Sequence, residues 1–506
     1  MVARIAATAH RAARATIAPS AHRLSRPTSL ALYLVAACAL RLMMLGKPAF
    51  QSDEQFYLLV GQRMAQGAVP FVDIWDRKPW GLFAIFRGAC ALPFDPVLSY
   101  QLLGLVFSVL TALVIERIAR FIAPRRAAQV AGLAYLVWQP VFNVALGQSP
   151  VFYNLPVALA ALIVIEARVR PRDPLLRRRG LEAMLLLGIA MQVKYTVLFE
   201  GMGFGLMLLA RGRADGWSAG RTLATALAWV GMALAPTAAV LFGYVLAGHG
   251  EAFVQANFLS IMGRSTDFGE ALVRLAKEAV ALTPFALALF LAPRKLAPVR
   301  GERPAVAPDL RLWALFAVGG FLLFGTWYDH YLGPVLVPLC VLAAPALART
   351  APAERWYGHL LLGMGLVGAI VVPAAQVVER GTTVQFAVAT RAIARELHGR
   401  CLFVYEGDSA LYRTTDACIP TRFAYPSHLN AMNEAAALGV DAVAETRRVL
   451  ASRPGVIVVS QSRRPNQPNM KTRALVHAAL EARYERYGVV TLGRRKFGLW
   501  RLRSPR

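Results

Sequence analysis

Apolar stretches of nearly membrane-spanning length alternate with short arginine-rich runs along most of this chain. A helix needs about 20 predominantly apolar residues to cross a bilayer. Residues 181–210 lie between two basic runs, and about 30 residues are too few for two full crossings, so two short helices are expected there. With these two, the pattern predicts a mainly α-helical polytopic membrane protein of about eleven transmembrane helices. The others are expected near residues 29–46, 97–117, 128–143, 151–167, 221–247, 272–292, 312–327, 331–348 and 358–378.

The arginine-rich runs set the expected orientation, because cytoplasmic loops carry an excess of Lys and Arg. A basic N-terminus precedes the first apolar segment, and no small-residue cleavage site follows that segment. This pattern predicts an uncleaved signal anchor with its N-terminus in the cytoplasm. Counting crossings from there places residues 47–96, the turn at Lys194 and everything after residue 378 on the outer, periplasm-like side.

The composition agrees with a membrane protein, since 57% of the residues are hydrophobic and 17% are charged. Soluble domains average about 25% charged residues. The formal net charge of +27 would suit a nucleic-acid partner, but the basic residues recur between apolar stretches instead of forming one patch. We therefore expect membrane lipid, and no nucleic acid, among the partners.

After residue 378 the composition becomes that of a soluble domain. The chain thus divides into a transmembrane domain, residues 1–378, and a small α/β domain, residues 379–506. In the second domain, hydrophobic periodicity predicts two helices, two strands and a last strand or hairpin. These are expected over Val384–His398 and Lys471–Tyr487, over Cys401–Tyr405 and Gly455–Ser460, and over Val489–Leu502.

The five cysteines contain no CxxC pair and no spacing typical of metal ligands. Cys401 and Cys418 are the two that fall in the predicted outer domain, where oxidising conditions favour disulfides. A disulfide between them and a pair of free thiols are both open at this point.

The first outer loop, residues 47–96, holds a dense group of acidic, basic and aromatic side chains. Asp53 and Glu54 follow the first apolar segment and open an expected amphipathic helix. Polar residues in a loop beside a membrane span form a functional hypothesis. The structural alternative for the pair is an acidic helix N-terminus with Ser52 as its cap.

Three features resemble bacterial glycosyltransferase family 39, which is related to dolichyl-phosphate-mannose protein mannosyltransferases and to aminoarabinose transferases of lipid A. They are the Asp-Glu pair after the first span, the stretch G-x-x-P-F-x-D-x-W-D-x-K-P at Gly67–Pro79, and Lys194 at the turn of a short helix pair. Gly407–Pro426 is similar to part of the outer domain of bacterial members. The resemblance implies the C-type glycosyltransferase fold in a bacterial inner membrane, with outer-face juxtamembrane helices in the first outer loop and a periplasmic C-terminal domain.

The same resemblance implies an inverting transfer of a sugar from a polyprenyl-phosphate donor to a cell-envelope acceptor (lipid, glycan or protein) on the periplasmic face. Such a transfer needs a base for the acceptor proton. Asp53 is the expected general base, with a pKa raised by lost hydration beside the bilayer. For Glu54, sharing protons with Asp53, orienting the acceptor and a structural role are all open.

Four basic residues are expected to hold the departing donor phosphate, because cations stabilise a leaving anion. Lys78 is the first candidate and Lys194 the second, with Arg41 and Arg77 as helpers. The alternative for Lys78 is a loop lysine in solvent, and for the other three it is snorkelling to the membrane interface.

Five residues are expected to contact sugar or acceptor, with anchoring at the lipid headgroups as the alternative: Asp73, Trp75, Asp76, His330 and Tyr331. The chain departs from the family pattern at Trp80, where members often have proline. It departs again at Gly147–Pro150, where many members carry an acidic residue. The sequence establishes no cofactor. A divalent metal stays open as an option, but the missing carboxylate leaves it without support from the sequence.

Two rival functions fit the same membrane pattern. A transporter or flippase of a lipid-linked glycan would use the same cations without needing Asp53 as a base. Such folds often contain internal repeats with broken helices in corresponding positions, and the second half of this chain offers no counterpart to the helix pair around Lys194. The other rival, an O-antigen ligase or polymerase, keeps the chemistry and changes the acceptor.

Overall fold

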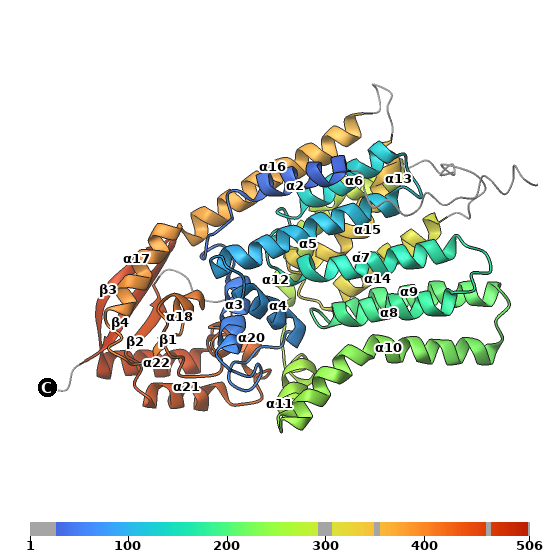
Figure 1. Cartoon of the computed structure of the whole chain (residues 1–506). Helices are drawn as coiled ribbons and strands as arrows, with labels where there is room; N and C mark the ends of the chain where they lie inside the picture. The colour runs from blue at the N-terminus through green and yellow to red at the C-terminus, as the bar shows by residue number, and fades with distance from the viewer. Residues whose placement is uncertain (1–26, 292–305, 349–354, 462–466, 504–506) are drawn as a thin grey trace, which may run out of the picture.

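The computed structural model describes residues 27–291, 306–348, 355–461 and 467–503. Figure 1 shows a bundle of long helices with an α/β domain attached at one end. Two short helices, α3 (Ser52–Ala65) and α4 (Trp80–Cys90), lie at that end beside the α/β domain. This architecture confirms the mainly helical fold with a small C-terminal α/β domain that the sequence predicts.

Among the described residues, five helical segments are long and apolar enough to cross a membrane. They are Pro96–Ala119, Ser149–Arg168, Ala219–Leu246, Asp329–Leu347 and Trp356–Ala394. The count of about eleven transmembrane helices therefore stays a prediction. The bundle consists of α2 (Pro27–Arg41), α5 (Pro96–Ala119), α6 (Arg125–Trp138), α7 (Ser149–Arg168), α8 (Leu176–Met191), α9 (Val197–Ala214), α10 (Ala219–Leu246), α12 (Phe268–Ala281), α13 (Thr283–Leu291), α14 (Ala307–Leu323), α15 (Gly333–Leu347) and α16 (Trp356–Arg380).

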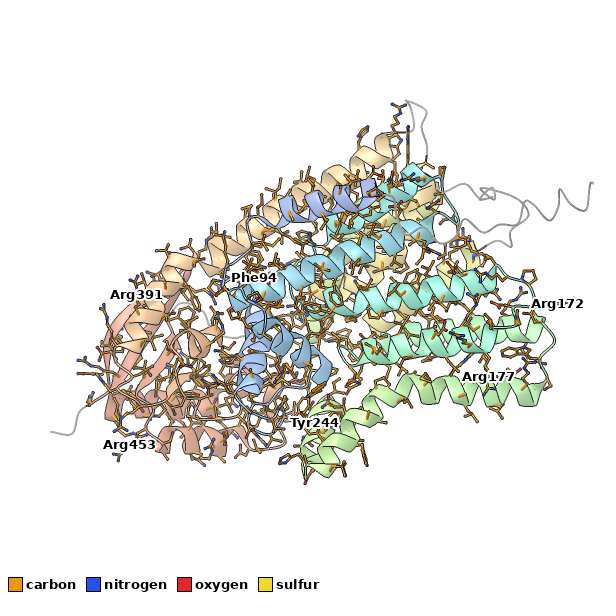
Figure 2. All side chains as sticks on the ribbon, in the orientation of Figure 1. Phe94, Arg172, Arg177, Tyr244, Arg391 and Arg453 are labelled. Carbon is orange, nitrogen blue, oxygen red and sulfur yellow. A yellow bond between two sulfur atoms is a disulfide. The ribbon has the colours of Figure 1, made fainter. Side chains whose placement is uncertain are left out.

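The two ends of the bundle carry different neighbours. Figure 2 labels Arg172 and Arg177 at the end remote from the α/β domain, and Arg391 and Arg453 within that domain. The turn between α8 and α9 lies at the α/β end, because the Leu82 amide at the start of α4 donates a hydrogen bond to the Gln192 carbonyl. The loop with α3 and α4, this turn and the α/β domain therefore meet at one end.

The side of the membrane that this end faces stays a prediction. Three of the basic segments that carry the predicted orientation fall wholly or partly outside the described residues, which exclude 1–26, 292–305 and 349–354.

A close helix contact positions the loop before α7. A Cβ atom at Gly104 of α5 would lie only 1.7 Å from the Leu146 carbonyl oxygen, so a side chain is excluded there. Small residues commonly permit such close approach in membrane bundles. The contact holds residues 143–148 against α5.

The α/β domain is built on a four-stranded sheet of order β1-β2-β4-β3. β1 and β2 are parallel, and β4 pairs antiparallel with both β2 and β3. Its elements are α17 (Thr383–Ala394), β1 (Leu402–Val404), α18 (Ala410–Thr414), α19 (Ser427–Asn430), α20 (Met432–Ala435), α21 (Ala442–Ala451), β2 (Val456–Ser460), α22 (Met470–Arg483), β3 (Tyr484–Leu492) and β4 (Arg495–Leu502).

The largest differences from the predicted boundaries lie where the last helix meets the last hairpin, since β3 begins at Tyr484 and not at Val489. The helix expected to reach Tyr487 ends at Arg483, because Tyr484 is already paired with Leu502 of β4. The buried Tyr484 hydroxyl also donates to the Pro454 carbonyl. Tertiary pairing thus overrides a helical pattern at its C-terminal end.

A disulfide joins Cys401 and Cys418 beside β1. The Leu402 amide donates to the Cys418 carbonyl, so the two segments are also linked through the backbone. The bond closes the loop that contains α18.

Candidate active site

Asp53 and Glu54 lie in the first turn of α3, where the helix dipole favours negative charge. Gln51 occupies the N-cap position, and no side chain caps the helix. The interpretation of Ser52 as the cap is therefore wrong, since Ser52 is the first helical residue. The acidic pair is placed by the helix start and by its tertiary contacts.

Asp53 faces cations and hydrogen-bond donors. The Tyr425 hydroxyl donates to Asp53 Oδ1 at 2.8 Å, and Gln148 Nε2 donates to Oδ2 at 3.5 Å. Burial would raise the pKa of Asp53, but Lys78, His330 and these two hydrogen bonds together hold it below its usual value. The predicted raised pKa is therefore wrong for Asp53, because nearby positive charge outweighs the lost hydration.

Glu54 turns into the helical bundle instead. Its side chain is 1% exposed, and its Oε1 accepts a hydrogen bond from the Gly147 amide at 2.9 Å. Burial raises the pKa of Glu54 to about 7, against the effect of the Gly147 hydrogen bond. Glu54 thus fastens the loop that carries Gln148 beside Asp53.

Lys78 and Lys194 come together from segments that are far apart in the sequence. Lys194 lies in the turn between α8 and α9, and its Nζ is 4.6 Å from the centroid of the Tyr331 ring. Burial and the charge of Lys78 lower the pKa of Lys194 to about 8. Within the described parts of the chain, no carboxylate oxygen lies within ion-pair distance of either lysine. Two lysines whose charges repel each other favour an anionic ligand.

A narrow hollow, with a cavity volume of about 30 Å³, adjoins Lys194 and Tyr331. Its remaining walls are largely apolar or aromatic. They include Tyr153 of α7 and Phe316 and Phe321 of α14. An apolar space beside paired cations suits a ligand with an anionic head and a hydrocarbon tail.

His330 and Tyr331 belong to this same cluster. The charge of His330 contributes to the lowered pKa of Asp53, and the Tyr331 ring lies beneath Lys194. His330 Nδ1 is 3.3 Å from Asp329 Oδ1, which fixes the imidazole. Asp76 interacts with the charge of Lys78: burial raises the pKa of Asp76, and the positive charge of Lys78 opposes that shift.

Arg41 and Arg77 are engaged elsewhere. Arg41 is fully buried and donates to the Ala145 carbonyl at 2.6 Å, to the Ala37 carbonyl at 3.2 Å and to the Gln139 side chain. This argues against a helper role in phosphate binding, because the guanidinium already has protein partners.

Arg77 forms an ion pair with Glu434 of the α/β domain. The same carboxylate lies 3.2 Å from Arg264. Arg77 therefore joins the loop to the α/β domain, and it shares the Glu434 carboxylate with Arg264. This geometry favours a structural role over the predicted phosphate contact.

Asp73 and Trp75 also serve the loop itself. Asp73 is exposed, and its Oδ2 accepts from the Val69 amide at 2.7 Å, which closes a turn. Trp75 is 1% exposed and packs edge-on against His428 of the α/β domain at 4.8 Å between ring centroids. These contacts favour structural roles over the expected contact with sugar or acceptor.

Sequence reasoning gave no role to Tyr425, Gln148 or Glu434, which all contact the loop. Tyr425 lies in Gly407–Pro426, the segment that is similar to part of the outer domain of the bacterial family members. Nothing in the sequence links Tyr425 to Asp53. Among the described residues, no group of three or more His, Cys, Asp and Glu side chains is arranged to hold a metal ion.

This helical bundle, with its acid–lysine cluster at the end that carries the α/β domain, shares its fold with a solved membrane-protein structure. The fold matches ArnT from Cupriavidus metallidurans in the apo state, with a TM-score of 0.65 and 16% identity over 93% of this chain and 97% of that one. The same protein bound to undecaprenyl phosphate gives a TM-score of 0.63 with the same identity and coverage.

Other comparisons are less informative. The oligosaccharyltransferase AglB from Archaeoglobus fulgidus matches 86% of this chain and 69% of its own at 12% identity, with a TM-score of 0.46 that is too low to support an argument. No protein-family model and no curated protein sequence matches the chain. At 16% identity, the likeness to ArnT shows the fold and not the activity.

Proposed function

We propose that this protein is a membrane glycosyltransferase that takes its sugar from a polyprenyl-phosphate donor. The observation that carries the proposal is the meeting of Asp53, Lys78 and Lys194 beside an apolar hollow. The lysines supply positive charge for a departing phosphate, and the hollow suits a lipid tail. A fold relative that binds undecaprenyl phosphate supports this choice of donor.

Asp53 acts as the general base in this proposal. The acceptor oxygen bonds to the anomeric carbon while its proton passes to the Asp53 carboxylate. The bond from the anomeric carbon to the phosphate oxygen breaks, and its electron pair leaves with the phosphate held by Lys78 and Lys194. One base and one in-line displacement give inversion at the anomeric carbon.

The lowered pKa of Asp53 is compatible with this role. A carboxylate that stays ionised is available to accept a proton throughout the neutral range. Its basicity is modest, so the electrostatic stabilisation of the leaving phosphate carries the larger share of catalysis. In the cell, the reaction is proposed to occur on the periplasmic face with an acceptor in the cell envelope.

Donor binding gives the first test. Undecaprenyl phosphate is titrated into the purified protein in lipid nanodiscs, and binding is followed by native mass spectrometry. Lys78→Ala and Lys194→Ala are each expected to weaken binding roughly tenfold to a hundredfold, because a charged hydrogen bond contributes about 1.5–3 kcal/mol. Lys47→Ala, in the same outer loop, is the matched control. Unchanged affinity in both variants would contradict the proposed phosphate site.

A transfer assay separates the enzyme from a lipid carrier. The wild type is incubated with radiolabelled polyprenyl-phosphate sugars and cell-envelope fractions. Transfer of label to an envelope component is the expected result. Binding of the donor without any transfer would favour a transporter or flippase instead.

A further inference from the structure

A second cavity lies next to Asp53: the carboxylate does not line it, but its chain neighbour Ser52 and its hydrogen-bond partner Tyr425 do. The cavity has a volume of about 260 Å³ and lies between the end of α16, the start of α3 and the α/β domain. It shares no lining residue with the hollow beside Lys194.

Tyr425 connects this cavity with the candidate base. Its side chain lines the cavity, and its hydroxyl donates to Asp53 Oδ1 at 2.8 Å. Ser52, the residue before Asp53, lines the same space. A molecule in the cavity therefore lies one hydrogen bond away from the carboxylate that would take its proton.

The cavity wall contains a built polar site. Asp408 Oδ2 and Arg495 Nη2 are 2.7 Å apart, and both side chains are largely buried. Ser409 is 1% exposed, and its Oγ has no hydrogen-bond partner among the described residues. Arg495 Nε likewise has none. Because unsatisfied buried polar atoms are costly, they indicate a ligand that supplies both donors and acceptors.

The chemistry of the wall points to a hydroxyl-rich ligand without strong net charge. Arg380 and Arg495 are balanced by Glu379 and Asp408 in the same lining. The other lining side chains are mostly hydroxyls, and large aliphatic groups are absent from the lining. Hydroxyl groups both donate and accept, so they complement guanidinium, carboxylate and serine groups together. The cavity volume of about 260 Å³ lies just below the range of about 300–1,000 Å³ that is usual for small-ligand sites.

We propose that this cavity is the acceptor site and that it binds the carbohydrate head of the acceptor. The inference rests on the proposed function, since it assigns the second substrate of the same reaction. The donor enters beside Lys194, the acceptor sugar occupies the cavity lined by Ser409 and Arg495, and its reacting hydroxyl meets Asp53 at Tyr425. A polypeptide acceptor is disfavoured, because the lining offers no apolar recess for side chains.

Blocking the cavity tests the proposal. Ser427 is half-buried in the lining and forms no side-chain hydrogen bond within the described residues, so Ser427→Trp fills the space and Ser427→Ala is the matched control. Saturation-transfer NMR measures binding of a panel of methyl glycosides and glucosamine disaccharides to the full chain in nanodiscs. The wild type and Ser427→Ala are expected to bind, whereas Ser427→Trp is expected to bind roughly tenfold or more weakly, because several hydrogen bonds are lost.

Binding of undecaprenyl phosphate in the same samples separates the two proposals. It should be unchanged in Ser427→Trp, which also shows that the variant is folded. If that variant does not fold, Arg380→Gln replaces it, with an expected loss of roughly threefold to tenfold in glycoside affinity.

Three results would overturn the acceptor site. The first is glycoside binding that Ser427→Trp does not change. The second is a wild type that binds undecaprenyl phosphate but no glycoside. The third is a Ser/Thr-rich dodecapeptide that binds the wild type and does not bind Ser427→Trp. Failure of the wild type to bind undecaprenyl phosphate would instead count against the donor proposal.

Discussion

Asp53 and Glu54 are neighbours in the first turn of α3, yet they face two different regions of the molecule. Asp53 points to the lysines and to the α/β domain, and it keeps a lowered pKa. Glu54 points into the helical bundle, where burial raises its pKa to about 7. Successive helical residues are rotated by about 100°, so adjacent side chains need not share surroundings. The surroundings of each carboxylate, and not their adjacency in the sequence, therefore decide which one suits the base role.

Replacing each carboxylate in turn by its amide tests most directly whether Asp53 and Glu54 have different roles. Asp53→Asn is expected to lower kcat by roughly 10²–10⁴-fold, the usual contribution of general-base catalysis. Glu54→Gln is expected to cost less than about tenfold, because a side-chain amide oxygen still accepts the Gly147 hydrogen bond. Single-turnover transfer measures both. Equal losses in the two variants would show that Glu54 takes part in the chemistry.

The contact from the α/β domain is expected to have a smaller effect. Tyr425→Phe removes a hydrogen bond that favours the ionised form of Asp53, so the pKa of Asp53 should rise. With about 1–1.5 kcal/mol for that bond, the acid limb of kcat/KM should move up by about one pH unit. Tyr487→Phe, which removes a hydroxyl from the sheet of the same domain, is the control. An unmoved acid limb would argue against the contact in the working enzyme.

The smallest expected effect is the pH dependence of donor binding, which follows from the charge of Lys194. The pKa of Lys194 is lowered to about 8, so its charge is present below that pH and is lost as the pH rises through it. Affinity for undecaprenyl phosphate should therefore fall severalfold between about pH 7 and pH 9.5, since one charged hydrogen bond is lost. Lys194→Arg should flatten the profile because arginine stays charged. A flat wild-type profile would contradict the role of Lys194.

Much of this protein follows from the order of its residues. The spacing of apolar stretches predicts a helical membrane protein, and the change in composition after residue 378 predicts the α/β domain. Both follow because buried helices and strands each require hydrophobic residues at a characteristic spacing. The density of charged and aromatic residues in loop 47–96 also marks the region around Asp53 and Lys78. Such local patterns need no knowledge of distant contacts.

Only the tertiary structure assigns the individual side chains. Arg41, Arg77, Asp73 and Trp75 have the residue types of a binding site, but they form hydrogen bonds, ion pairs or packing contacts within the protein. Tyr425 contacts Asp53 across 372 positions in the sequence. The direction of the Asp53 pKa shift also depends on charges that arrive from other segments, and a balance of burial against charge is set by distances that no local pattern contains. Local sequence patterns thus identify the region that carries the proposed chemistry, whereas the folded arrangement identifies the side chains in that region that can perform it.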